Sequence, residues 1–407
     1  MLSALERITG LDRKGQGPAF LVASGHGATH WLLGTFYVLL PYITRDLGLS
    51  YTQAGGLVTL FHAAAFAANA GSGAVVDIGF RHVQVQAASL FLGAFSLLAF
   101  AFAERLLWLV PLVVLLGATN NLWHPAAIAY LSSRYPRNRG YALSIHTLGA
   151  SFGDMLAPVA AGALLSLLSW QATALLCALP AALVALLLLA VLGRGAAQAR
   201  ESGEEGGVRD YLRRLSALVG NRAMLGLCTM AGFRSMTQNG VLVFIPLYLA
   251  DVLKVSPVVL GFVLMGMQVG GMIAGPVAGT LSDALGRQPV VFAGITAATL
   301  IIIGLTLVST PALFILLVTL MGFALFSVRP VIHSWTMDLA PKGTSGSAVS
   351  LLFASQSGLS ALVPLAGGLI ADRWGLAAVF YALAGTMVVA NILVYLLPDA
   401  PAQSESA

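Results

Sequence analysis

Charged residues are scarce in this chain: they make up 9% of its 407 residues, whereas a soluble domain carries about 25%. Cysteine is scarcer still. Cys177 and Cys228 are the two cysteines, and their number and spacing exclude a disulfide framework and a paired-cysteine metal site. The sequence also lacks the glycine-rich loop with Lys-Ser or Lys-Thr that binds ATP phosphates, which disfavours an ATP-driven pump.

Hydrophobic residues make up 58% of the chain, and its mean hydropathy is +0.88. They occur in blocks longer than about 18 residues, which predicts transmembrane helices. Charges and glycines precede the first block and no small-residue cleavage site follows it, so we expect it to be a retained first helix rather than a signal peptide. Twelve spans are predicted, at 18–44, 51–76, 82–103, 106–134, 138–168, 171–192, 222–250, 256–282, 288–308, 311–339, 343–371 and 376–397.

The basic residues orient these spans. Fifteen Arg and Lys fall in one set of loops and four in the other, which predicts that both termini are cytoplasmic. Because the net charge of +5 resides in loops, it does not indicate nucleic-acid binding. Two helical bundles are predicted, at 1–192 and 222–398, with a tail at 399–407. The linker between the bundles, 193–221, carries apolar residues at helical spacing. The spacing predicts an amphipathic helix on the cytoplasmic membrane surface, with a solvated linker as the alternative.

The two halves repeat at an offset of about 206 residues. The repeat is visible in four markers: Asp77 with Asp283, Arg81 with Arg287, the His-Pro at 124–125 with the Arg-Pro at 329–330, and the stretch PVAAG at 158–162 with PLAGG at 364–368. We therefore expect an all-α integral membrane protein of twelve transmembrane helices, in two six-helix pseudo-symmetric bundles around a central cavity.

Twelve spans, a charged linker and a loop motif used twice resemble the major facilitator superfamily over essentially the whole chain. The second copy of the motif has Gly279, Asp283, Gly286 and Arg287, whereas the first has Ile78 and Phe80 at positions that depart from the pattern. The resemblance implies that these loops stabilise one end-state of a rocking cycle. The predicted conformational latch comprises Asp77, Arg81, Gly279, Asp283, Arg287 and Asp338.

Within that superfamily, the stretch "LWHPAAIAYLSSRYPRNRGYALSIHTLGASFGDMLAPVAAGAL" is similar to the fosmidomycin-resistance branch, which carries a similar His-Pro followed by a basic turn. That resemblance implies efflux of anionic, phosphonate-like compounds, drug resistance, and a multi-pass location in the bacterial inner membrane. The glycines and proline at Gly149, Gly153, Pro158 and Gly162 loosely resemble an antiporter motif and favour export.

Polar groups inside the predicted spans identify candidate site residues, because a charge at membrane depth costs about 2.5–3.5 kcal/mol. Arg234 and Arg329 predict an anion site, since a guanidinium stays charged and matches carboxylate or phosphate oxygens. The alternative is an arginine bonded to helix carbonyls or to an acid. Asp154 and His62 are the candidates for proton coupling, with a static ion pair and helix packing as alternatives. The predicted substrate-binding residues are Arg234, Arg329, His124, His30, His26, Gln238, Asn121 and Trp123.

The sequence thus predicts a proton-coupled secondary transporter that exports a small anionic or amphipathic organic compound, and a monomer in the lipid bilayer. Import of an organic anion with a proton stays open. A signalling sensor is disfavoured because the predicted tails are short. An enzyme is disfavoured because Ser144 and His146, a candidate nucleophile and base, are two residues apart on a helix and face away from each other. Histidine clusters can bind metal, but no acidic cluster accompanies these, so we expect no metal and no cofactor.

Overall fold

A computed structural model describes Glu6 and residues 10–77, 82–193, 218–308, 310–341 and 345–398. Several predicted features lie outside these residues: Arg81, most of the amphipathic linker helix at 194–217, and the tail at 399–407. The backbone of Asp77 is described as the end of a helix, but its side chain is not among the described ones. The first copy of the latch motif therefore remains a prediction.

The described chain is all-helical, with no strand in the ranges above. The first half contains α2 (Arg13–Asp46), α3 (Tyr51–Asp77), α4 (His82–Phe100), α5 (Leu106–Arg134), α6 (Arg139–Leu165) and α7 (Trp170–Leu192). The second half contains α9 (Arg222–Asp251), α10 (Pro257–Leu285), α11 (Arg287–Leu307), α12 (Pro311–Leu339), α13 (Ser345–Ala361), α14 (Val363–Trp374) and α15 (Leu376–Leu396).

Two helix boundaries differ from the predicted spans for local reasons. Helix α2 begins at Arg13 rather than at residue 18 because the Asp12 side chain accepts a hydrogen bond from the Gly15 N–H and caps the helix. The eleventh span, predicted as one helix over 343–371, is broken at Leu362 into α13 and α14. Pro364 lies in the first turn of α14, where it has no N–H to donate to the carbonyl oxygen four residues earlier, so the hydrogen-bond ladder is interrupted between α13 and α14.

Nine segments of the described chain are long and apolar enough to cross a membrane, among them α4 to α7, α10 to α12 and α15. The ninth runs over Ser347–Trp374 and so joins α13 and α14. Helix α7 exposes Leu183, Leu186 and Val191, as a helix facing lipid does. Helices α2 and α9 are longer than most of these segments but too polar to be counted among them.

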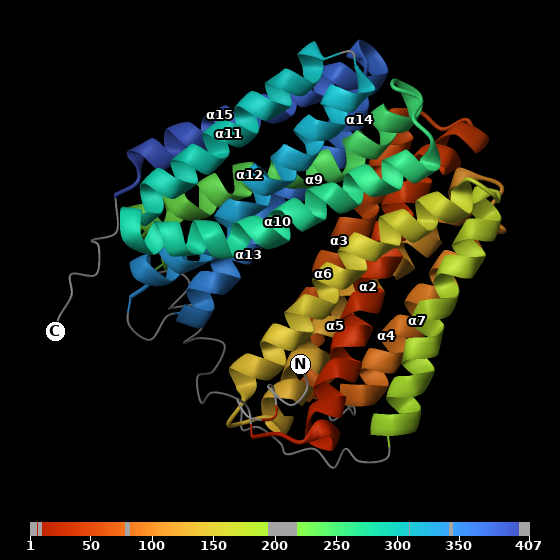
Figure 1. The fold of residues 1–407 in the computed structure, drawn as a ribbon, viewed down its shortest axis with the longest axis vertical. Coiled ribbons are helices and arrows are strands. Elements are labelled where there is room, and N and C mark those ends of the chain that lie inside the picture. Colours follow the sequence, from red (N-terminus) through yellow and green to blue (C-terminus); the bar gives the residue numbers. More distant parts are fainter. Residues whose placement is uncertain are drawn as a thin grey trace. The chain divides into compact units, whose positions relative to one another are not determined.

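Contacts divide the chain into two compact units. Unit 1 comprises 1–49, 60–202 and 256–262, and unit 2 comprises 50–59, 203–255 and 263–407. Within unit 1, α2 packs on α6 and α7, and α4 packs on α5 and α7 (Figure 1). Within unit 2, α9 packs on α13 and α15, and α11 packs on α12 and α15. The same helix pairs thus recur in each half, as a parallel repeat requires.

The most extensive helix contact in unit 1, between α2 and α6, is made backbone to backbone through glycine. A Cβ added to Gly149 would overlap the carbonyl oxygen of Ala23, and one added to Gly153 would overlap that of Gly27. Small residues at such positions let membrane helices approach closely, where dispersion contacts substitute for a hydrophobic driving force. This close approach brings the polar side chains of α2 and α6 within reach of each other.

We expect Gly153→Leu to destabilise the folded protein by about 1–3 kcal/mol or more, because the added side chain must push α6 away from α2. The measurement is thermal unfolding of the purified protein in detergent. Gly140→Ala is the control, since a Cβ there has no atom of the described chain within 4 Å. An unchanged melting temperature for Gly153→Leu would contradict the tight α2–α6 contact.

Candidate functional site

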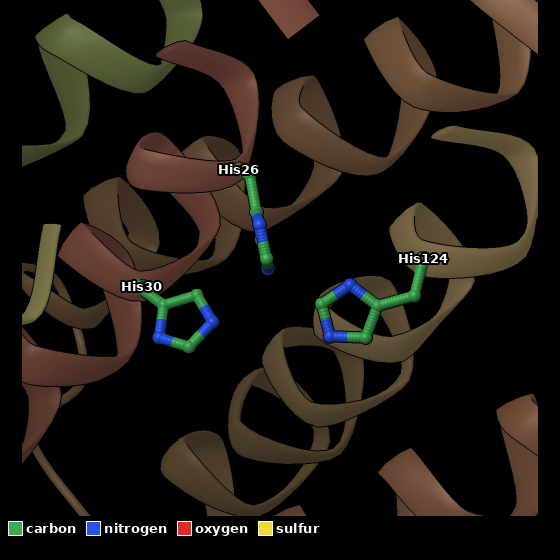
Figure 2. A group of neighbouring side chains, drawn as sticks. All are labelled: His26, His30 and His124. Carbon is green, nitrogen blue, oxygen red and sulfur yellow. The ribbon is translucent and has the colours of Figure 1, made fainter. Parts of the chain in front are cut away.

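Three histidines from two helices of unit 1 converge on one space. His26 and His30 lie one turn apart on α2, and His124 lies on α5 (Figure 2). The centroid of the His26 ring lies 4.8 Å from the centroid of the His30 ring and 5.0 Å from that of the His124 ring. His146 of α6 stacks on His26 at 3.8 Å, with an angle of 16° between the ring planes. Four imidazoles therefore form one contiguous group, which we call the histidine cluster.

Hydrogen bonds fix the orientation of two of these rings. Nδ1 of His26 lies 2.8 Å from the backbone oxygen of His146, and Nδ1 of His30 lies 2.9 Å from Oδ1 of Asp154 on α6. Because a carbonyl and a carboxylate can only accept, each Nδ1 carries a hydrogen, and in a neutral ring Nε2 then has a lone pair. The His30 and Asp154 side chains are 25% and 29% exposed, so neither is fully enclosed by protein.

Two other predicted substrate ligands are engaged in helix packing. Trp123 is fully buried against Gly25, and its Nε1 donates to Nε2 of His146 over 3.4 Å. Nδ2 of Asn121 donates to the carbonyl oxygen of Ala65 on α3 over 2.9 Å. In this conformation their N–H groups serve unit 1 itself, so Trp123 supports the histidine cluster and Asn121 ties α5 to α3.

His62, predicted to couple protons, forms a different contact. Its Nε2 lies 3.2 Å from the hydroxyl of Tyr37 on α2, which is itself 6% exposed. Tyr37 also lies within electrostatic range of Asp154. Unit 1 therefore holds two neighbouring pairs of titratable or hydroxyl groups, His30 with Asp154 and Tyr37 with His62.

In unit 2, basic side chains gather on α9 and α12. Arg234 of α9 is 1% exposed; its Nη2 donates to the carbonyl oxygen of Leu325, and its Nε has no hydrogen-bond partner among the described residues. Arg329 of α12 is exposed, and its charge is felt by both Arg234 and His333. Gln238, one turn after Arg234 on α9, is half-buried. A buried arginine beside like charge is what an anion would stabilise.

The second copy of the loop motif forms a polar network in unit 2. Arg287 Nε donates to Oδ2 of Asp338 over 3.0 Å, and its Nη1 donates to Asp283 and to the Ser282 hydroxyl. Gly286 before it has a φ of +96°, a conformation that side chains other than glycine rarely adopt. Gly279 has open space around its Cα. The motif thus ties the α10–α11 turn to the end of α12.

A comparison with sequence profiles of known families identifies the family of this chain. The profile of the Major Facilitator Superfamily matches residues 22–239 and 227–407, which together include nearly the whole chain. This chain belongs to the major facilitator superfamily. It is accordingly a multi-pass membrane transporter.

Two relatives of this superfamily member are similar over most of their length. A protein of Lactococcus lactis subsp. lactis (strain IL1403) named multi-drug resistance efflux pump PmrA homolog is 24% identical over 371 residues, 87% of this chain and 88% of its own. An uncharacterized MFS-type transporter of Bacillus subtilis (strain 168), YfnC, is 24% identical over 372 residues, 89% of this chain and 88% of its own.

Solved structures share the fold of this transporter. A bacterial homolog of the human lysosomal transporter Spinster, inward-facing and unoccupied, superposes with a TM-score of 0.76 at 16% identity, over 95% of this chain and 96% of that one. The nucleoside transporter NupG superposes with a TM-score of 0.81 at 14% identity, over 93% and 99% of the two chains. At these identities the likeness is one of architecture.

Two residues of the site were undervalued or missed by sequence reasoning. His146 is not among the predicted site residues, yet it stacks on His26. Tyr37 was not singled out, although it lies seven residues after His30 and therefore on the same face of α2. Helical spacing from His30 is the signal that could have found it.

Proposed function

We propose that this transporter exchanges protons for a small anionic or amphipathic organic compound and exports it, with phosphonate-like molecules as the first class to test. The observation that carries the proposal is the buried guanidinium of Arg234 in unit 2, combined with the His30–Asp154 pair in unit 1. Both are expensive in a membrane protein unless they serve a ligand or a proton.

Arg234 and Arg329 provide the anion site in this proposal. The two positive charges repel each other, and a carboxylate or phosphonate offers oxygens in a geometry that guanidinium N–H groups match. Gln238, on the same face of α9 as Arg234, would donate a further hydrogen bond. In unit 1, His26, His30 and His124 would contact other polar atoms of the substrate, with Nε2 of His26 and of His30 as hydrogen-bond acceptors because each Nδ1 already donates within the unit. The similarity to the fosmidomycin-resistance branch agrees with an anionic substrate.

Asp154 is the coupling residue in this proposal, because it is a partly buried carboxylate bonded to a group that can itself carry a proton. A proton that binds Asp154 removes the negative charge beside His30 and adds a hydroxyl donor, so proton binding and the hydrogen bonds of the site are linked. Tyr37 and His62 extend this path through unit 1. The network around Arg287 acts as the latch of one end-state, with the Asp77 and Arg81 loop as its counterpart.

Export is favoured by the efflux function in the name of the Lactococcus relative and by the glycine-rich α6. The distribution of basic residues supports an orientation with both termini cytoplasmic. A monomer in a bacterial inner membrane is the state we propose, and the bacterial relative agrees with that location.

The test is transport by the purified protein in proteoliposomes with an imposed pH gradient, using phosphonates, organic carboxylates and neutral amphipathic drugs in parallel. We expect anions to move against the proton gradient and to acidify the compartment they leave. Gradient-independent movement of every compound, or movement of neutral compounds alone, would contradict the proposal.

A further inference from the structure

We propose that unit 1 binds a divalent transition-metal ion of the zinc class between His26, His30 and His124. The inference goes beyond the transport function and does not depend on it, because a chain that carried no anion would still hold these ligands. It also departs from the absence of metal expected from the sequence. The sequence offered no acidic cluster near the histidines, but folding brings Asp154, 124 residues away from His30, against the ring.

The ligand atoms already lie near coordination distance. One ring nitrogen of each of the three histidines lies within 4.8 Å of one ring nitrogen of the other two. Zinc–nitrogen bonds of about 2.0–2.1 Å place tetrahedral ligands about 3.3 Å apart, so the rings must close by about 1.5 Å at most. Figure 2 shows the three rings facing a common space, so rotation about side-chain bonds supplies this movement.

The ring nitrogens are prepared for a cation. Nδ1 of His26 and Nδ1 of His30 are both occupied by oxygen acceptors, which leaves a lone pair on Nε2 of each ring. Nδ1 of His124 is buried, and no residue in the described ranges is hydrogen-bonded to it. His26 and His30 are four residues apart on one helix face, a spacing that places two imidazoles on one zinc ion.

Groups behind the ligands complete the pattern of a metal site. A carboxylate that accepts from the far nitrogen of a ligating histidine fixes the ring and increases its basicity, and Asp154 has this relation to His30. The backbone oxygen of His146 has the same relation to His26. Nε2 of the His146 ring accepts a hydrogen bond from Trp123, so the His146 ring packs behind the ligands rather than among them. Three protein ligands leave a fourth position for water or a substrate oxygen.

The ligand set also selects the ion. Neutral imidazoles suit zinc, nickel, cobalt and copper, whereas magnesium and calcium require oxygen ligands. We therefore expect ZnCl2 to bind the full-length protein, purified in detergent without a polyhistidine tag, at one ion per chain by calorimetry. MgCl2 and CaCl2 at the same concentrations should give no heat and should not compete. Cobalt bound to the parent protein should give the visible absorption of a tetrahedral nitrogen site.

Variants then assign the ligands. His26→Gln, His30→Gln and His124→Gln should each lower zinc affinity by at least about 100-fold, and Asp154→Asn by about 10–100-fold. His82→Gln, the same change outside the cluster, should bind as the parent does. Arg234→Gln should bind zinc normally even though its KM for anionic substrates rises by about 30-fold or more, which separates this proposal from the transport function. Absence of saturable zinc binding, an octahedral cobalt spectrum, or parent-like affinity in the three ligand variants would overturn the site.

Discussion

Asp154→Asn should abolish accumulation of substrate driven by a pH gradient while preserving exchange of labelled for unlabelled substrate at equal pH. Asparagine has nearly the same shape as aspartate and still offers an oxygen to Nδ1 of His30, but it cannot take up a proton. If one proton moves per substrate, each unit of pH gradient supports about tenfold accumulation. The expected result is therefore a fall from about tenfold to no accumulation across a one-unit gradient, measured in proteoliposomes.

The matched control is Asp46→Asn, the same change at an exposed carboxylate at the end of α2. It should accumulate substrate as the parent does. Accumulation that persists in Asp154→Asn would remove Asp154 from the coupling step. Loss of both accumulation and exchange, in a protein that still elutes as a folded monomer, would assign Asp154 to substrate binding instead.

Arg234→Gln should raise the KM for anionic substrates by about 30-fold or more, because removing one member of a buried charge pair costs about 2 kcal/mol or more. Arg234→Lys should fall between Gln and the parent, since lysine keeps the charge but lacks the planar fork that binds two oxygens. Neutral amphipathic compounds should be carried by all three proteins with similar KM. The measurement is initial-rate flux with anionic and neutral members of one compound series.

Arg234 has a competing structural role, because its Nη2 already donates to the carbonyl oxygen of Leu325. If this bond is its whole purpose, both variants should lose thermal stability, and the folded fraction should keep the parent's KM for anions. Arg105→Gln, at an exposed arginine that precedes α5, is the control and should change neither quantity.

The fold could be predicted from sequence because hydropathy alone determines where a chain of this composition can cross a bilayer. Each predicted span overlaps at least one helix of the described chain, and the superfamily assigned from the repeat is confirmed by the profile match. The break at Leu362 was missed because Pro364 interrupts the helix without interrupting the hydropathy. Hydropathy averages over a span, whereas a proline acts on one hydrogen bond.

The candidate site was predictable as a list of residues but not as an arrangement. The free-energy cost of a polar side chain inside the membrane identified four candidates individually, whatever direction each side chain takes: His26, His30, His124 and Asp154. Their convergence depends on the depth and rotation of α2 against α6, which Gly149 and Gly153 set through backbone contact. The sequence does not show which helix a glycine packs against. The histidine cluster, and the metal site that we infer from it, could therefore be recognised only in the structure.

The polarity of α2 and α9 has a consequence for how the protein is made. Both helices carry site residues and fall short of the hydropathy of the other spans, so neither should partition into lipid efficiently by itself during synthesis. Within its unit, α2 contacts α6 most extensively, and α9 contacts α13 and α15. These partners are synthesised well after α2 and α9. We expect α2 and α9 to wait at the insertion machinery until those later helices emerge, so that the chemistry of the site sets the order of biogenesis.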